Sequence, residues 1–127
     1  MTFDPIKFLD IATKLLYDTK FDEETRYRTC TSRAYYAAHL FTREKLKGIE
    51  ITIKIEKDEK IGIIHDKVIH ALAGKNKKLG EMLFDLRERR GDADYDLNKK
   101  FSGYGYAVGL DISNAEFIIN EVDKLKK

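Results

Sequence analysis

The chain has 127 residues, of which 43% are hydrophobic and 36% charged, and its net charge is +2 at pH 7. This length accommodates one hydrophobic core, so we expect a single domain over residues 1–127. The small net charge excludes a generic polyanion binder, and nucleic-acid binding would require a local basic patch. Cys30 is the one cysteine, which excludes an internal disulfide and a multi-cysteine zinc site. We expect it to be a small buried packing residue.

The first residues contain neither a basic region nor the long apolar run of a secretory signal. No stretch of membrane-spanning length is free of charged residues. The sequence therefore predicts a cytoplasmic protein that does not associate with membranes.

Apolar residues recur at helical spacing in five segments, which predicts an all-α, up-and-down bundle of about five helices. The first helix is expected to begin with Asp4 as N-cap and Pro5 at the first helical position, and to end near residue 17. The second is expected to be the longest, from about Glu23 to Lys47, with Asp22 as N-cap and Gly48 as its end. It has apolar residues on two sides, which is typical of a central helix or of a subunit interface.

Isoleucines alternate with polar residues between Ile49 and Ile55, a pattern typical of a strand. A single strand has no partner in a helical bundle, and isolated strands are not stable. We therefore interpret residues 49–58 as an extended connector packed on the bundle, whose copy in a dimer is a candidate pairing partner.

The third helix is expected over residues 61–73 with Gly74 as its end, and the fourth from about Lys78 after a basic loop. Residues 102–111, "SGYGYAVGLD", are interpreted as a turn-rich loop with at most a short helical turn. The last helix is then expected to open with a capping box formed by Ser113 and Glu116.

The stretch "RERRGDADYD", residues 87–96, closes the fourth helix. On a helical wheel Arg90 lies only about 30° from the centre of the apolar stripe, whereas Arg87 and Arg89 flank it. A guanidinium keeps its charge and must find acceptors there. Gly91 is expected to let the chain bend. Two interpretations remain: a structural ion pair between Arg90 and a carboxylate such as Asp94, or a phosphate pocket in which Arg90 binds and Asp94 and Tyr95 orient the ligand.

Other sites are weakly supported. The three histidines, His39, His65 and His70, are interpreted as surface or hydrogen-bonded residues, because His65 and His70 do not share a helix face. No glycine-rich phosphate loop and no nucleophile elbow is present, so we expect no metal and no cofactor. Basic and aromatic residues gather around the fourth helix. They suit either single-stranded nucleic acid or a solvated surface over core aromatics.

Two segments resemble a known family. "SRAYYAAHLFTREKL", residues 32–46, resembles the second-helix signature of the HEPN superfamily, an arginine followed by paired tyrosines and alanines. "RGDADYDL", residues 90–97, resembles the Arg-x-x-Ala-Asp-Tyr motif near the end of the fourth helix in one HEPN branch. The resemblance implies a helical bundle that pairs as a homodimer, with the motif arginines of both subunits at a shared cleft.

The resemblance also implies function. Many HEPN proteins are metal-independent ribonucleases, often toxins, others bind nucleotides or RNA, and many are encoded beside a minimal nucleotidyltransferase that acts as antitoxin. The ribonucleases have a histidine a few residues after the arginine, but here Tyr95 stands in its place. Because tyrosine has a pKa near 10, it is a poor base at neutral pH, which favours binding over cleavage. In related pairs the partner enzyme adenylylates a tyrosine near the motif, and Tyr95 is the candidate.

Three hypotheses follow. The leading one is a dimeric nucleotide- or RNA-binding module acting with a nucleotidyltransferase partner. The second is a metal-independent endoribonuclease, with Arg90 stabilising the transition state and Tyr95 or His65 assisting proton transfer. The third is a non-catalytic scaffold that assembles through a dimer surface including Arg33, Tyr36 and Leu40. The candidate ligand-binding residues are Arg90, Asp94, Tyr95, Arg87, Arg33 and Tyr36, with Arg90 and Tyr95 the candidates for catalysis.

Overall fold

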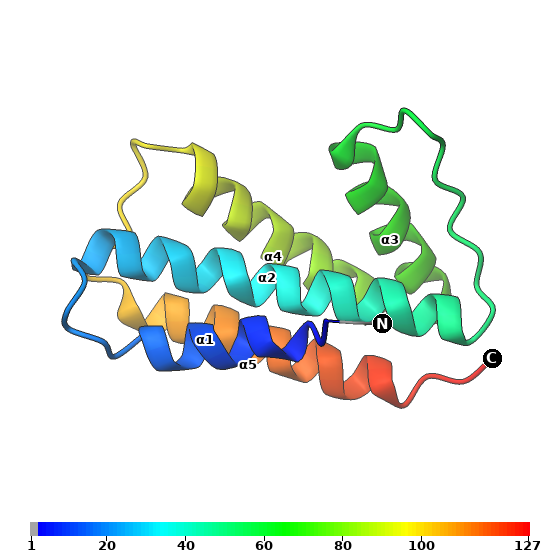
Figure 1. Cartoon of the computed structure of the whole chain (residues 1–127), viewed down its shortest axis with the longest axis horizontal. Helices are drawn as coiled ribbons and strands as arrows, with labels where there is room; N and C mark the ends of the chain where they lie inside the picture. Colours follow the sequence, from blue (N-terminus) through cyan, green and yellow to red (C-terminus); the bar gives the residue numbers. More distant parts are fainter. Residues whose placement is uncertain (1–2) are drawn as a thin grey trace.

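The computed structural model describes residues 3–127 and contains five helices over that range. They are α1 (Ile6–Leu15), α2 (Glu23–Gly48), α3 (Ile61–Lys75), α4 (Lys77–Tyr95) and α5 (Gly105–Asp123). The long helix α2 runs through the middle of the molecule, with α1 and α5 along one side and α3 and α4 along the other (Figure 1). It contacts each of the other four helices. The all-α bundle and the central position of α2 are thereby confirmed.

Small side chains allow the neighbouring helices to approach α2 closely. Cys30, Ala34, Ala37 and Ala38 of α2 have no exposed surface, so a stripe of small residues forms the centre of the core. The Cys30 thiol donates to the carbonyl oxygen of Ala12 at 3.3 Å, and burial raises its pKa to about 11. The expectation that Cys30 is a packing residue is confirmed.

The N-terminus of α2 follows its sequence signal, since Asp22 accepts a hydrogen bond from the Thr25 amide at 2.9 Å. The C-terminus of α2 differs from the expectation that Gly48 ends the helix. Gly48 is still helical, and the residue with positive φ is Glu50, at 65°. The Ile51 amide donates to the Leu46 carbonyl at 2.9 Å, and the Glu50 amide donates to Lys47 at 3.1 Å. This is a Schellman motif with Glu50 at the position that usually holds glycine.

Helices α3 and α4 are joined by a single residue, so the expected basic loop at residues 75–78 is wrong. Gly74 lies inside α3. Asn76 ends α3 in an extended conformation and also caps α4, because its side-chain oxygen accepts from the Leu79 amide at 3.1 Å. After this tight joint the two helices pack closely, and a Cβ on Gly80 would lie 2.5 Å from the Cβ of Ala73.

The expected loop at residues 102–111 is also wrong, because α5 begins at Gly105 and Ser113 lies in its interior. Burial explains the difference. Val108, Asp111 and Ile112 lie on one buried stripe, and their packing outweighs the low helix propensity of the glycines. Position 105 requires a glycine because an added Cβ would lie 2.7 Å from the Tyr27 hydroxyl oxygen.

Gly91 does not bend the chain, because α4 continues through it to Tyr95. The end of α4 is held instead by two residues of α2. The Arg28 guanidinium donates to the carbonyl oxygens of Asp92 (3.2 Å), Ala93 (3.0 Å), Asp96 (3.1 Å) and Lys99. Glu24 accepts from the backbone amides that follow, those of residues 101 and 102. These contacts satisfy the free carbonyl groups at a helix end.

Residues 49–60 join α2 to α3. The extended connector expected over residues 49–58 is confirmed for residues 51–56, whereas residues 49–50 and 57–58 form turns. Ile49, Ile51 and Ile53 pack partly against the core, whereas Ile55 is 38% exposed. Among the described residues, no helix combines the length and the apolar character that a membrane crossing requires.

We predict that Glu50→Gly raises the free energy of unfolding by about 1 kcal/mol, because glycine adopts positive φ without the Cβ clash. Gly48→Ala should also stabilise the chain, by about 1 kcal/mol, since the residue is helical. An added Cβ there meets nothing within 4 Å. Urea unfolding midpoints test both changes. Glu50→Ala is the matched control, because it removes the carboxylate but keeps the strained backbone. A midpoint for Glu50→Gly no higher than that of the control would contradict this account.

Candidate functional site

Arg90 lies on the inner face of α4 and is only 8% exposed, as the helical wheel predicts. Its guanidinium carbon lies over three tyrosine rings, 5.3 Å from the ring centre of Tyr35, 5.6 Å from Tyr36 and 5.7 Å from Tyr95. Its Nε atom is buried and has no hydrogen-bond partner within residues 3–127. Its one carboxylate contact is Asp94, whose Oδ2 lies 3.9 Å from Nη1. The aromatic rings stabilise the charge but do not satisfy the N–H groups.

Asp94 links Arg90 to α2. Its Oδ2 accepts from the Ser32 hydroxyl at 3.1 Å, and Arg33 donates to the same hydroxyl oxygen at 3.3 Å. The ion pair that one interpretation expected therefore exists, but 3.9 Å is too long for a hydrogen bond. A hollow of about 340 Å³ adjoins this contact and is lined by residues that include Ser32, Arg33 and Asp94.

The two flanking arginines are engaged elsewhere. Arg87 forms an ion pair with Asp66 of α3 and donates to the Gly62 carbonyl at 3.1 Å. Arg89 binds both carboxylate oxygens of the buried Asp111, with its closest contact at 2.8 Å. Both side chains thus hold α4 against its neighbours. Among the three arginines of this stretch, Arg90 is the one whose N–H donors are largely left without acceptors within residues 3–127.

A buried pair of histidines lies beside Arg90. The expectation of surface or hydrogen-bonded histidines is confirmed for the exposed His70 and for the hydrogen-bonded His65 but is wrong for His39. His39 of α2 and His65 of α3 are each 3% exposed, and their ring centres are 4.2 Å apart. The Tyr35 hydroxyl hydrogen-bonds Nδ1 of His65. Nδ1 of His39 has no partner within the described chain.

One sequence signal points to part of this cluster. Tyr35 and His39 are four residues apart, so they share a face of α2, and their rings stack 5.5 Å apart. His65 comes from another helix, and only the fold brings it there.

Electrostatics keeps both histidines neutral at physiological pH. Burial, followed by the neighbouring His65 and by Arg43, lowers the pKa of His39 to about 3. Burial, followed by Arg90 and Arg87, lowers the pKa of His65 to about 4, although Asp66 acts in the opposite direction. Burial also raises the pKa of the Tyr35 hydroxyl. Guanidinium groups outnumber carboxylates around this cluster, so the cluster favours an anion.

The remaining predicted residues lie at the edge of the cluster. The Arg33 guanidinium lies 4.9 Å from the ring centre of Tyr36, and Tyr95 is 74% exposed at the end of α4. The structure therefore brings Arg90, Asp94, Tyr95, Arg33 and Tyr36 into one series of contacts. Over residues 3–127, no group of three or more His, Cys, Asp or Glu side chains is arranged to hold a metal ion.

The basic and aromatic residues beyond α4 separate into two groups. Phe101 is a core residue, whereas Tyr104 and Tyr106 are exposed. Lys99, Lys100 and Tyr104 line a second hollow of about 290 Å³.

No family model, curated protein or solved structure matches the chain, so the site is interpreted from its own geometry.

The histidine pair predicts a pH dependence. The unfolded chain takes up protons on His39 and His65 as the pH falls through 6.5, whereas the folded chain does so only near pH 3–4. The stability contributed by these neutral histidines is therefore complete well above pH 6.5 and decreases on acidification, by about 1.5 kcal/mol per histidine between pH 6.5 and 5.

This pH dependence is measured by urea unfolding at a series of pH values. We expect the decrease between pH 6.5 and 5 to be smaller in His39→Asn and to be unchanged in His70→Asn, whose imidazole is exposed. An equal decrease in the unmodified chain and in His39→Asn would contradict the expectation.

Proposed function

We propose that the chain is a HEPN-like module that binds the phosphate of a nucleotide or of RNA at Arg90, as a homodimer, together with a nucleotidyltransferase partner in a toxin–antitoxin-like pair. The observation that carries the phosphate site is the under-satisfied guanidinium. Buried polar groups are normally hydrogen-bonded, yet Nε of Arg90 has no partner within residues 3–127. A planar fork of N–H donors suits the oxygens of a phosphate, which accept two parallel hydrogen bonds.

The residues around Arg90 support a nucleotide rather than a simple anion. Tyr36 and Tyr95 present aromatic rings on which a base can stack, and stacking does not depend on base identity. The Asp94 carboxylate repels a phosphate but accepts hydrogen bonds from ribose hydroxyl groups, so it orients the sugar side of the ligand. Arg33 adds a second cation from α2.

The partner and the homodimer follow from the HEPN resemblance. Modification by a nucleotidyltransferase requires an accessible hydroxyl, and Tyr95 meets this requirement with 74% of its surface exposed. We propose Tyr95 as the tyrosine that such a partner adenylylates.

We predict that AMP, ATP and a short single-stranded RNA shift the backbone NMR resonances of residues 87–96, and that Arg90→Gln weakens this binding at least tenfold. Lys77→Gln, at the opposite end of α4, is the control and should leave mononucleotide affinity unchanged. Thermal unfolding of each variant verifies that it folds. A folded Arg90→Gln protein that binds these ligands as tightly as the unmodified chain would contradict the proposal. Absence of any shift in the unmodified chain would favour the non-catalytic scaffold.

The His39–His65 pair supports endoribonuclease activity as a second candidate function. A neutral imidazole beside a phosphate-binding arginine can accept the proton of the 2′-hydroxyl and, as the imidazolium formed in that step, pass it to the 5′-oxygen leaving group. The products would be a 2′,3′-cyclic phosphate and a 5′-hydroxyl, and no metal is required. Here the two neutral imidazoles come from α2 and α3, whereas the motif position holds Tyr95.

Metal-free cleavage of structured RNA in EDTA tests this second function. We predict that His65→Ala and His39→Ala each lower the cleavage rate by at least 10²-fold, whereas Tyr95→Phe retains most of it. Binding without cleavage by the unmodified chain would exclude the ribonuclease and leave phosphate binding intact. Equal rates in Tyr95→Phe and His65→Ala would contradict the assignment to the histidines.

A further inference from the structure

The connector contains a stretch of extended backbone whose hydrogen-bonding groups are almost all free. Within the described chain, the amides of residues 52–56 donate no hydrogen bond. The carbonyl oxygen of Lys54 accepts from Lys67 Nζ at 2.6 Å, and that of Glu56 accepts from the Glu59 amide at 3.2 Å. The other carbonyl groups of residues 51–55 accept none. Exposed extended backbone of this kind is a template for pairing with another strand.

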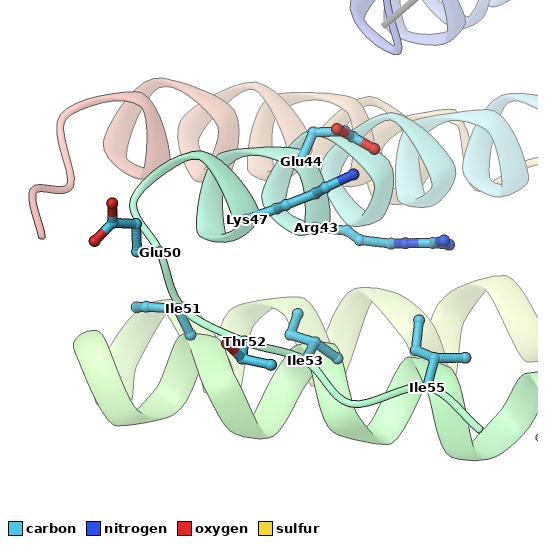
Figure 2. A pocket seen from close by; sticks show the side chains of 8 residues that line it. All are labelled: Arg43, Glu44, Lys47, Glu50, Ile51, Thr52, Ile53 and Ile55. Carbon is cyan, nitrogen blue, oxygen red and sulfur yellow. The ribbon is translucent and has the colours of Figure 1, made fainter.

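Neither neighbouring helix covers this backbone. A hollow of about 350 Å³ separates the connector from α2, and Figure 2 shows Ile53 and Ile55 pointing towards its far wall, where Arg43 and Lys47 lie. A second hollow of about 540 Å³ lies between the connector and α3. The connector is thus anchored by isoleucine side chains while its backbone stays accessible.

The side chains are suited to pairing with an identical segment. Isoleucines occupy positions 51, 53 and 55, and Thr52, Lys54 and Glu56 occupy the other face. In an antiparallel pair, directly opposed residues share a face, so the register decides which side chains meet.

Registers centred on residues 52 to 55 keep isoleucine on one face. Centring the pair on Thr52 pairs only residues 51–53 before it reaches Glu50, whose φ of 65° is not extended. Centring the pair on Lys54 places this lysine opposite its own copy, and like charges directly opposite are destabilising. Centring it on Ile55 extends the pairing into the turn at residues 57–58. Centring it on Ile53 pairs five extended residues, with Ile51 opposite Ile55 and Thr52 opposite Lys54, and opposes no like charges among them.

We propose that residues 51–55 pair antiparallel with the same residues of a second copy, about a two-fold axis at Ile53. Such a contact is isologous, as expected for a symmetric dimer. The isoleucine face of the ribbon then lies on the two bundles, and the face carrying Thr52, Lys54 and Glu56 lies towards water. A two-stranded ribbon alone is marginal, but each strand is already packed on its own bundle through Ile51 and Ile53. The proposal does not depend on phosphate binding at Arg90.

Proline substitution separates backbone pairing from side-chain effects. Thr52→Pro/Ile53→Pro removes one amide from each edge of the strand, and neither amide is used within the chain. Thr52→Ala/Ile53→Ala removes the same side chains and keeps both amides. Sedimentation velocity should give the proline variant a dimer dissociation constant at least tenfold higher than that of the alanine variant. Equal dissociation constants, or a monomer for the unmodified chain at every concentration, would overturn the proposal.

Disulfide trapping tests the register. Cys30 is fully buried, so introduced cysteines are the reactive ones. A mixture of Thr52→Cys and Lys54→Cys chains should form the mixed disulfide dimer in preference to either self-linked dimer. A predominance of Lys54→Cys self-linked dimer, or no trapping at all, contradicts the centre at Ile53. An Arg90→Gln chain that loses nucleotide binding but still gives the mixed disulfide shows that the two sites are independent.

Discussion

The positive charge of Arg90 is permanent, and much of the arrangement around it is a consequence of burying that charge. A guanidinium that is 8% exposed needs an environment that tolerates a cation, and three tyrosine rings provide it through their negative faces. Burial, and after it the charge of Arg90, lowers the pKa of His65, and burial with the neighbouring His65 and Arg43 lowers that of His39, so both imidazoles stay neutral. The centre of the bundle therefore holds one permanent cation, the guanidinium, beside two imidazoles that do not become protonated.

Three other arginines, Arg26, Arg28 and Arg89, show how such a charge can be satisfied. Arg26 donates to three carbonyl oxygens around the end of α1, Arg28 to four around the end of α4, and Arg89 to both oxygens of Asp111. Each holds two segments together. Arg90 has the burial of these structural arginines without their acceptors, and this contrast within one chain distinguishes it from them.

How far the sequence predicts the structure depends on whether the deciding interaction is local. Asp22 and the inward orientation of Arg90 were predictable, because capping and helical periodicity involve residues within a few positions of each other. The start of α5 and the continuation of α4 through Gly91 were not, because packing against α2 outweighs the preference of glycine for turns. His65 joins His39 only through the fold. Three sequence-predicted site residues, Arg90, Asp94 and Tyr95, are brought into contact because one helical turn already holds them together.

Asn76 serves as the last cap of α3 and the first cap of α4, and Gly80 allows the two helices to touch. Because the joint is one residue long and the helices touch at Gly80, α3 and α4 form one helical hairpin. This hairpin begins at the connector and ends at Tyr95, so the extended segment and the motif of Arg90 belong to one continuous supersecondary unit.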